Sequence, residues 1–169
     1  MPTGKEIVTE KINNCVNKLY NEDSYLFESG VCERCLMFRL AHYLQANFSD
    51  YFVDCEFNKM GFNEYKHIDK VELNSLGNEL KRMFADIIIH KRNSNVEDNY
   101  VCLEIKRTRR AINNDVRRLE RMTNSRGFKH GNTRYIYGYD FGFLIYLPKN
   151  KDKSWVRIFE NGAEASLID

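Results

Sequence analysis

The chain has 169 residues, of which 43% are hydrophobic and 30% are charged, and its formal net charge is +2. This length favours one domain, spanning residues 1–169, and the composition is that of a globular protein. A membrane-spanning helix is excluded because no apolar run reaches about 18 residues. The first residues also lack an apolar segment like that of a secretory signal, so we expect a cytoplasmic protein.

Two amphipathic helices are predicted in the first third of the chain. Residues 5–20 carry apolar side chains at helical spacing, and a polar loop is expected at residues 21–24. Ser29 suits the N-cap of a second helix that runs from about Gly30 to Asn47. The apolar stripe of this second helix consists of Leu36, Met37, Leu40 and Leu44.

The middle of the chain is rich in strand signals. Residues 51–57 alternate enough to form a strand, whereas residues 58–82 are polar and mixed, so a short helix and a hairpin both stay open there. Two runs rich in β-branched residues, 84–89 and 100–105, are joined by a polar, turn-like segment. These two runs predict a hairpin.

The last third of the chain completes the predicted order of elements. Apolar residues at positions 112, 116, 119 and 122 repeat at helical spacing, and residues 141–147 and 155–159 predict two further strands. With the earlier elements, this order predicts an α/β fold of the mixed α+β kind. Its centre would be a mixed sheet of four to five strands flanked by helices.

Three charged residues interrupt the apolar pattern of the predicted hairpin. Asp86 lies in the first strand, and Glu104 and Lys106 lie two positions apart in the second. Side chains two apart on a strand share a face, so Glu104 and Lys106 address one site, which Asp86 joins if the hairpin pairs it alongside. Two carboxylates suit a hard cation such as Mg²⁺, and a lysine beside them can orient a water. The trio predicts hydrolysis of a phosphodiester.

The pair Ala85-Asp86 and, eighteen positions after Asp86, the triplet Glu104-Ile105-Lys106 resemble the motif of the PD-(D/E)XK nuclease superfamily. Ala85 stands where that motif has proline, a change that removes no ligand. The resemblance implies a restriction-endonuclease-like core with an N-terminal helical extension. It also implies Mg²⁺ or Mn²⁺ as cofactor, held by Asp86, Glu104 and the carbonyl of Ile105, with Lys106 as the catalytic residue. DNA is the implied substrate, and cutting both strands would need a homodimer.

Glu33 is a further candidate for the same site. It shares a helical face with Met37 and Leu40, so it heads the stripe that we expect to face the sheet. The resemblance implies that Glu33 is a metal ligand and catalytic residue, because many members of the superfamily carry a glutamate on the first core helix. The alternatives are a carboxylate favoured by the helix dipole, or a salt bridge to Arg34 or Arg39.

A run of basic residues begins at Lys106 and is opposed locally only by Asp115 and Glu120. Such a patch is the electrostatic footprint of phosphate binding, although a solvated helix face gives the same pattern. Beside the predicted metal site, we interpret it as a nucleic-acid-binding surface. The side chains assigned to the phosphate backbone are Arg107, Arg109, Arg110, Arg117 and Arg121.

Several other signals carry less weight. Cys32 and Cys35 form a C-x-x-C that could be half of a zinc site, but no second close pair accompanies it. With five cysteines at irregular spacing, reduced thiols are expected rather than disulfides. Glu56 and His90 are expected at the surface. Alternating aromatic residues from Tyr135 to Phe143 could stack on bases, but a strand with aromatic core positions is favoured.

Two other functions stay open. The chain could be a nucleic-acid-binding or protein-interaction module that keeps the fold and does not cut. Alternatively, Glu104 and Lys106 could be an exposed strand pair and Asp86 a polar edge residue, with a purely structural role.

Overall fold

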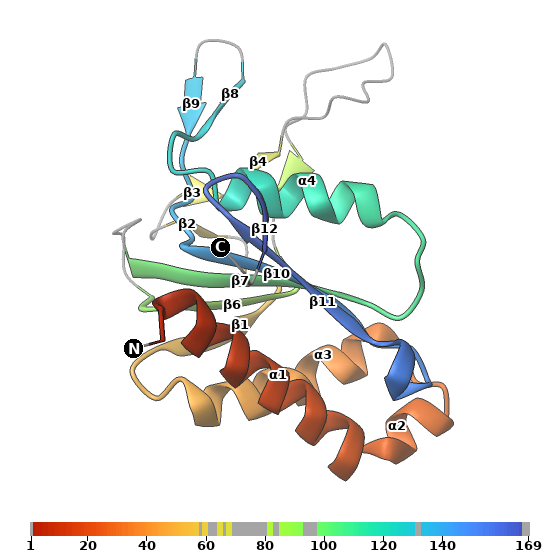
Figure 1. Cartoon of the computed structure of the whole chain (residues 1–169). Coiled ribbons are helices and arrows are strands. Elements are labelled where there is room, and N and C mark those ends of the chain that lie inside the picture. The colour runs from red at the N-terminus through yellow and green to blue at the C-terminus, as the bar shows by residue number, and fades with distance from the viewer. Residues whose placement is uncertain are drawn as a thin grey trace.

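A mixed six-stranded sheet forms the centre of the computed structural model, with helices on both of its faces (Figure 1). The structure describes residues 2–57, 59–60, 64–65, 67–68, 81–82, 85–92, 98–130 and 133–166. The sheet has the strand order β1-β6-β7-β10-β11-β12. Its strands are β1 (Phe52–Cys55), β6 (Ile87–His90), β7 (Asn99–Lys106), β10 (Phe141–Tyr146), β11 (Trp155–Glu160) and β12 (Ala163–Ala165).

The helices before the sheet begin and end differently from the prediction. Helix α1 (Gly4–Glu22) extends two residues into the predicted loop, and only Asp23 separates it from the short helix α2 (Ser24–Glu28). Ser29 is not an N-cap, because its N–H and hydroxyl both donate to the carbonyl of Tyr25 and close α2. Helix α3 (Glu33–Asn47) therefore starts three residues later than predicted, after Cys32 as N-cap.

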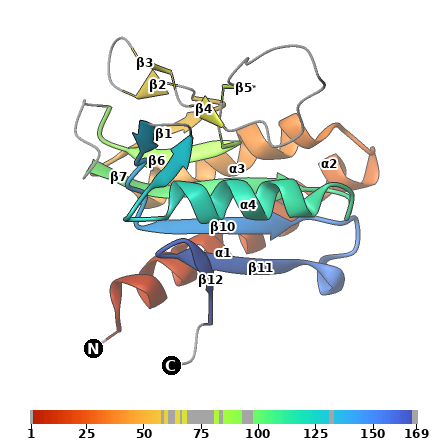
Figure 2. The ribbon, with the colours of Figure 1, turned by 90° about the horizontal axis from the view of Figure 1, so that it is seen from above.

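The central hairpin and the predicted later elements are confirmed. Strands β6 and β7 pair antiparallel, with Ile87 opposite Leu103. Helix α4 (Ile112–Met122) then connects β7 to β10, which pairs with β7 in parallel. Parallel neighbours need such a crossover connection. Viewed from above, α4 lies along β7 and β10 (Figure 2).

Alternating side chains of β7 pack against two different layers. Leu103 and Ile105 belong to the core that the sheet shares with α1 and α3. Cys102 belongs to the core on the other face, together with Leu119 and Met122 of α4. Because strand side chains alternate, Glu104 and Lys106 face the α4 layer.

The sheet has six strands, so the predicted four to five was too few. Strand β12 is the additional one, and it pairs antiparallel with β11, with Glu160 opposite Ala163. Asn161 and Gly162 form the turn between them with φ values of 53° and 82°. A two-residue turn with both φ values positive is the type I′ turn that Asn-Gly favours, and it matches the twist of a hairpin.

Shorter strands lie outside the main sheet. They form the antiparallel pairs β2 (Lys59–Met60) with β3 (Glu64–Tyr65), β4 (His67–Ile68) with β5 (Lys81–Arg82), and β8 (Phe128–His130) with β9 (Thr133–Tyr135). The prediction for residues 58–82 falls mostly outside the described residues. None of the helices in the described part of the chain is long and apolar enough to cross a membrane.

His90, expected at the surface, is instead buried at the end of β6 with 4% of its area exposed. Its Nε2 lies 2.8 Å from Oδ2 of Asp54 on the neighbouring strand β1, and Nε of Arg92 donates to the same oxygen at 2.7 Å. The guanidinium of Arg92 and, after it, the imidazole of His90 lower the pKa of Asp54. This triplet ties β1 to β6.

Candidate active site

The structure brings the three motif residues together where β6 begins and β7 ends. Asp86 immediately precedes β6, and its Oδ2 accepts a hydrogen bond of 2.7 Å from the N–H of Ile105. The pairing of Ile87 with Leu103 places Asp86 level with Glu104. The predicted convergence of Asp86, Glu104 and Lys106 is therefore seen in the structure.

Glu104 is the most confined of these side chains, with none of its area exposed. Its Oε1 lies 3.1 Å from Nε of Arg118, and within the described residues neither carboxylate oxygen has a hydrogen-bond partner. Burial, followed by the neighbouring charge of Asp86, raises the pKa of Glu104 well above its usual range. A buried carboxylate with an unsatisfied oxygen is costly, so this position requires a compensating partner.

Lys106 reaches carboxylates from both faces of the sheet. Its Nζ lies 3.3 Å from Oδ2 of Asp115 on α4 and 3.6 Å from Oε1 of Glu33 on α3. Burial alone would lower the pKa of Lys106, but Asp115, Glu33 and the other two carboxylates together raise it. The group at the centre of the cluster is therefore an ammonium held by acids.

Glu33 lies in the first turn of α3, where it also contacts the backbone after β7. Its Oε2 accepts a hydrogen bond of 2.8 Å from the N–H of Arg107. The guanidinium of Arg107 in turn donates to the carbonyl of Val31, which fixes the segment before α3. Two anchors therefore hold the start of α3 against the end of β7.

The arginines considered as alternative partners of Glu33 form ion pairs elsewhere. Nε of Arg34 lies 2.9 Å from Glu56, and Nε of Arg39 lies 2.7 Å from Asp23. Glu56 therefore forms an exposed ion pair, as expected of an outward polar residue. Glu33 is left to contact the cluster around Lys106.

Asp115 and Arg118 join the site from α4, although they were not predicted as site residues. Asp115 is 2% exposed, and its Oδ1 lies 2.7 Å from Nη2 of Arg118. Burial raises the pKa of Asp115, against the lowering effect of Lys106 and Arg118. A signal was present in the sequence, because Asp115 heads the buried stripe that continues through Leu119 and Met122.

These carboxylates fit a hard divalent cation in their chemistry. Oxygen ligands are those that Mg²⁺ and Mn²⁺ prefer, and Glu104 supplies a buried oxygen without a hydrogen-bond partner beside Asp86. Among the described residues, no three Asp, Glu, His or Cys side chains already form a group that could hold a metal ion. The cations of Lys106 and Arg118 instead compensate the acids.

The arginines predicted to bind phosphate divide into two groups. Arg109, Arg110 and Arg117 are exposed on the β7–α4 connection and on α4, whereas Arg107 and Arg121 are partly buried. The guanidinium of Arg109 lies 5.5 Å from the ring centre of Tyr146. Arg109 and Arg110 lie on the connection that follows the end of β7, and Arg117 lies in the middle of α4.

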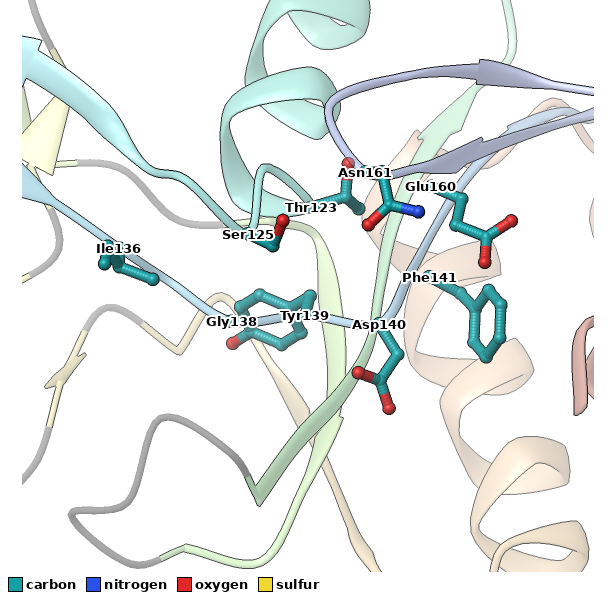
Figure 3. A pocket seen from close by; sticks show the side chains of 9 residues that line it. All are labelled: Thr123, Ser125, Ile136, Gly138, Tyr139, Asp140, Phe141, Glu160 and Asn161. Atoms are coloured by element: carbon teal, nitrogen blue, oxygen red, sulfur yellow. The ribbon is translucent and has the colours of Figure 1, made fainter.

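A hollow of about 430 Å³ lies away from this cluster, at the opposite end of α4 (Figure 3). Thr123, which follows α4, lines it together with Asp140 and Glu160. Three of the aromatic residues considered for base stacking are core residues, because Tyr137, Tyr139 and Phe143 are at most 2% exposed. Base stacking by these three side chains is therefore excluded, and the side chain of Tyr135 is outside the described residues.

Comparison of the chain with protein-family models, curated proteins and solved structures finds no match. The functional assignment therefore depends on the geometry of the cluster and on the short sequence motif.

Proposed function

We propose that this protein is a divalent-metal-dependent nuclease that hydrolyses phosphodiester bonds, with DNA as the preferred substrate, on a restriction-endonuclease-like core. One observation carries the proposal. Glu104 is fully buried, has an oxygen without a hydrogen-bond partner, and lies beside Asp86 with Lys106 on the same face of β7. The contact with Arg118 at 3.1 Å offsets only part of the cost of burying this carboxylate, and a bound cation would offset the rest.

The proposed metal ligands are the carboxylates of Asp86, Glu104 and Glu33 and the carbonyl of Ile105. When bound, Mg²⁺ or Mn²⁺ supplies Lewis-acid polarisation of a phosphoryl oxygen and eases deprotonation of the attacking water. The hydrogen bond from the N–H of Ile105 orients the Asp86 carboxylate toward the end of β7. Ligand orientation of this kind is needed for metal affinity.

Lys106 is the proposed catalytic cation. Its ammonium positions the attacking water and stabilises the charge that builds on the phosphate. Asp115 and Glu33, at 3.3 and 3.6 Å, hold Nζ from opposite sides. Asp115 is therefore a positioning residue, since it acts through Lys106.

In the absence of a metal ion, the guanidinium of Arg118 compensates the negative charges of Glu104 and Asp115, because it contacts both carboxylates. The exposed Arg109, Arg110 and Arg117 are the proposed contacts to the phosphate backbone. Binding through such contacts weakens with salt, because counterions are released from the nucleic acid. A second copy of the chain would be required to cut both strands at one position.

The test is cleavage of plasmid and oligonucleotide DNA with Mg²⁺ or Mn²⁺. Glu104→Gln and Lys106→Ala are expected to abolish cleavage while retaining the circular dichroism spectrum of the wild type. Glu10→Gln is the matched control, because Glu10 is exposed on α1. Unchanged cleavage by both site variants would overturn the assignment.

A second candidate function is a binding module on the same fold that does not cut. The contacts of Lys106 and Arg118, which neutralise the acids without a metal ion, favour it. This candidate predicts that DNA binds, that Mn²⁺ gives no heat in calorimetry, and that a panel of DNA and RNA substrates stays intact. Measurable Mn²⁺ binding that Glu104→Gln removes would exclude it.

A further inference from the structure

Two cysteines meet at the start of α3, outside the carboxylate cluster. Cys32 is the N-cap of this 15-residue helix and Cys35 lies in its first turn, and both side chains are exposed. Their Sγ atoms are 3.5 Å apart, and neither is in a disulfide. A disulfide has an S–S length of about 2.05 Å, so the two sulfurs need to approach by only about 1.5 Å.

The two thiols differ in reactivity. Cys32 is the N-cap of α3, the helix end at which the backbone dipole stabilises a thiolate, and its carbonyl accepts a hydrogen bond of 3.1 Å from the N–H of Cys35. Because the thiolate is the nucleophile in disulfide exchange, Cys32 is the attacking group and Cys35 the resolving group.

The other cysteines of the chain are internal controls. Cys15 and Cys102 are buried and Cys55 is partly buried. Burial raises the pKa of Cys15 and that of Cys55 to about 11, so their thiolate fractions at neutral pH are very small. Exposure and sulfur–sulfur contact therefore distinguish Cys32 and Cys35 from these three.

We propose that Cys32 and Cys35 form a thiol–disulfide exchange site whose substrate is a small, accessible disulfide of the glutathione class. The Cys32 thiolate attacks one sulfur of the substrate, forming a mixed disulfide and releasing one substrate thiolate. Cys35, on losing its proton, attacks Sγ of Cys32, which releases the second substrate thiolate and closes the Cys32–Cys35 disulfide. The substrate disulfide is reduced to two thiols, which take the two protons, and the protein dithiol is oxidised.

The test uses the reduced full-length chain, equilibrated with a series of ratios of glutathione disulfide to glutathione, then acid-quenched, alkylated and analysed by peptide mass spectrometry. Cys32 and Cys35 should lose alkylation together, with loss of two hydrogens from their shared peptide, and dithiothreitol should reverse both changes. Cys15 and Cys102 should be unchanged. With an alkylating agent alone at neutral pH, Cys32 should react more than about tenfold faster than Cys15, because the thiol of Cys32 is exposed and that of Cys15 is buried.

Single variants separate the two roles. Cys35→Ser should accumulate the mixed disulfide on Cys32, because the resolving thiol is gone, whereas Cys32→Ser should leave Cys35 largely alkylatable. Both changes are at exposed side chains, and circular dichroism checks the fold. Full alkylation of both cysteines at the most oxidising ratio would overturn the proposal, as would equal trapping in the two variants. Stoichiometric co-purifying zinc that blocks alkylation until it is chelated would also overturn it.

Discussion

Replacing Glu104 with glutamine is expected to stabilise the metal-free protein. Glu104 has no exposed area, and its oxygens lack hydrogen-bond partners within the described structure. An unsatisfied buried polar group costs about 1–3 kcal/mol, and more if charged. The ion pair with Arg118 at 3.1 Å offsets part of this cost. Arg118 keeps its ion pair with Asp115 at 2.7 Å when Glu104 becomes neutral, so the substitution leaves no unpaired cation. We therefore expect Glu104→Gln to raise the free energy of unfolding by about 1–3 kcal/mol at neutral pH.

The same substitution should remove stabilisation by metal. A ligand that binds only the folded state at about 100 times its Kd adds about 2.7 kcal/mol to the free energy of unfolding. The wild type should gain this stability in saturating Mn²⁺, and Glu104→Gln should gain none. Glu104→Gln should therefore be more stable than the wild type in EDTA, and this difference should disappear in Mn²⁺.

Urea unfolding followed by circular dichroism, in EDTA and in Mn²⁺, measures both effects. Glu10→Gln, at an exposed position of α1, should follow the wild type in both conditions. If Glu104→Gln were destabilised by more than about 1 kcal/mol in EDTA, or gained as much stability from Mn²⁺ as the wild type, the reasoning would be refuted.

Three further predictions follow from individual contacts. Arg118→Met removes a cation that contacts two acids, so it should lower the free energy of unfolding without metal by about 3–5 kcal/mol. It should also raise the affinity for Mn²⁺ measured by calorimetry. Arg117→Met, at an exposed position of the same helix, should change neither quantity. Arg92 and His90 lower the pKa of Asp54, so their contacts with its carboxylate stabilise the folded state above about pH 3.9. This stabilisation is lost as the pH falls through the lower pKa that Asp54 has in the folded state. The urea midpoints of wild type and Asp54→Asn should therefore differ at pH 6 and converge in acid; a constant difference would contradict this. Replacing Arg109 and Arg110 with alanine should reduce the slope of log affinity for DNA against log salt by about 2 in fluorescence anisotropy, and an unchanged slope would remove them from the interface.

Local patterns were sufficient to predict the elements that hold the site. The apolar repeat at residues 112, 116, 119 and 122 predicted helix α4, and the β-branched runs predicted the hairpin that brings Asp86 beside Glu104. Both signals are repeats of residue type within a single helix or strand, so they can be read without knowing how the elements pack. The start of α3 was wrong because Ser29 closes α2 instead, and a capping residue can serve either neighbouring helix.

The unpredicted features depend on contacts between elements distant in sequence. Asp115 reaches Lys106 only because α4 packs over β7, and His90 is buried because β1 places Asp54 against it. Strand β12 is different, since the Asn161-Gly162 pair before it is a local hairpin signal that depends on no distant contact.

Crystals of the protein soaked in Mn²⁺ give the most direct test of the central claim. The anomalous difference map should show one strong peak at about 2.0–2.6 Å from carboxylate oxygens of Asp86 and Glu104. Glu104→Gln crystals should lack this peak. The account would be contradicted if wild-type crystals, soaked at a Mn²⁺ concentration at which the protein cleaves DNA, gave no peak at these oxygens.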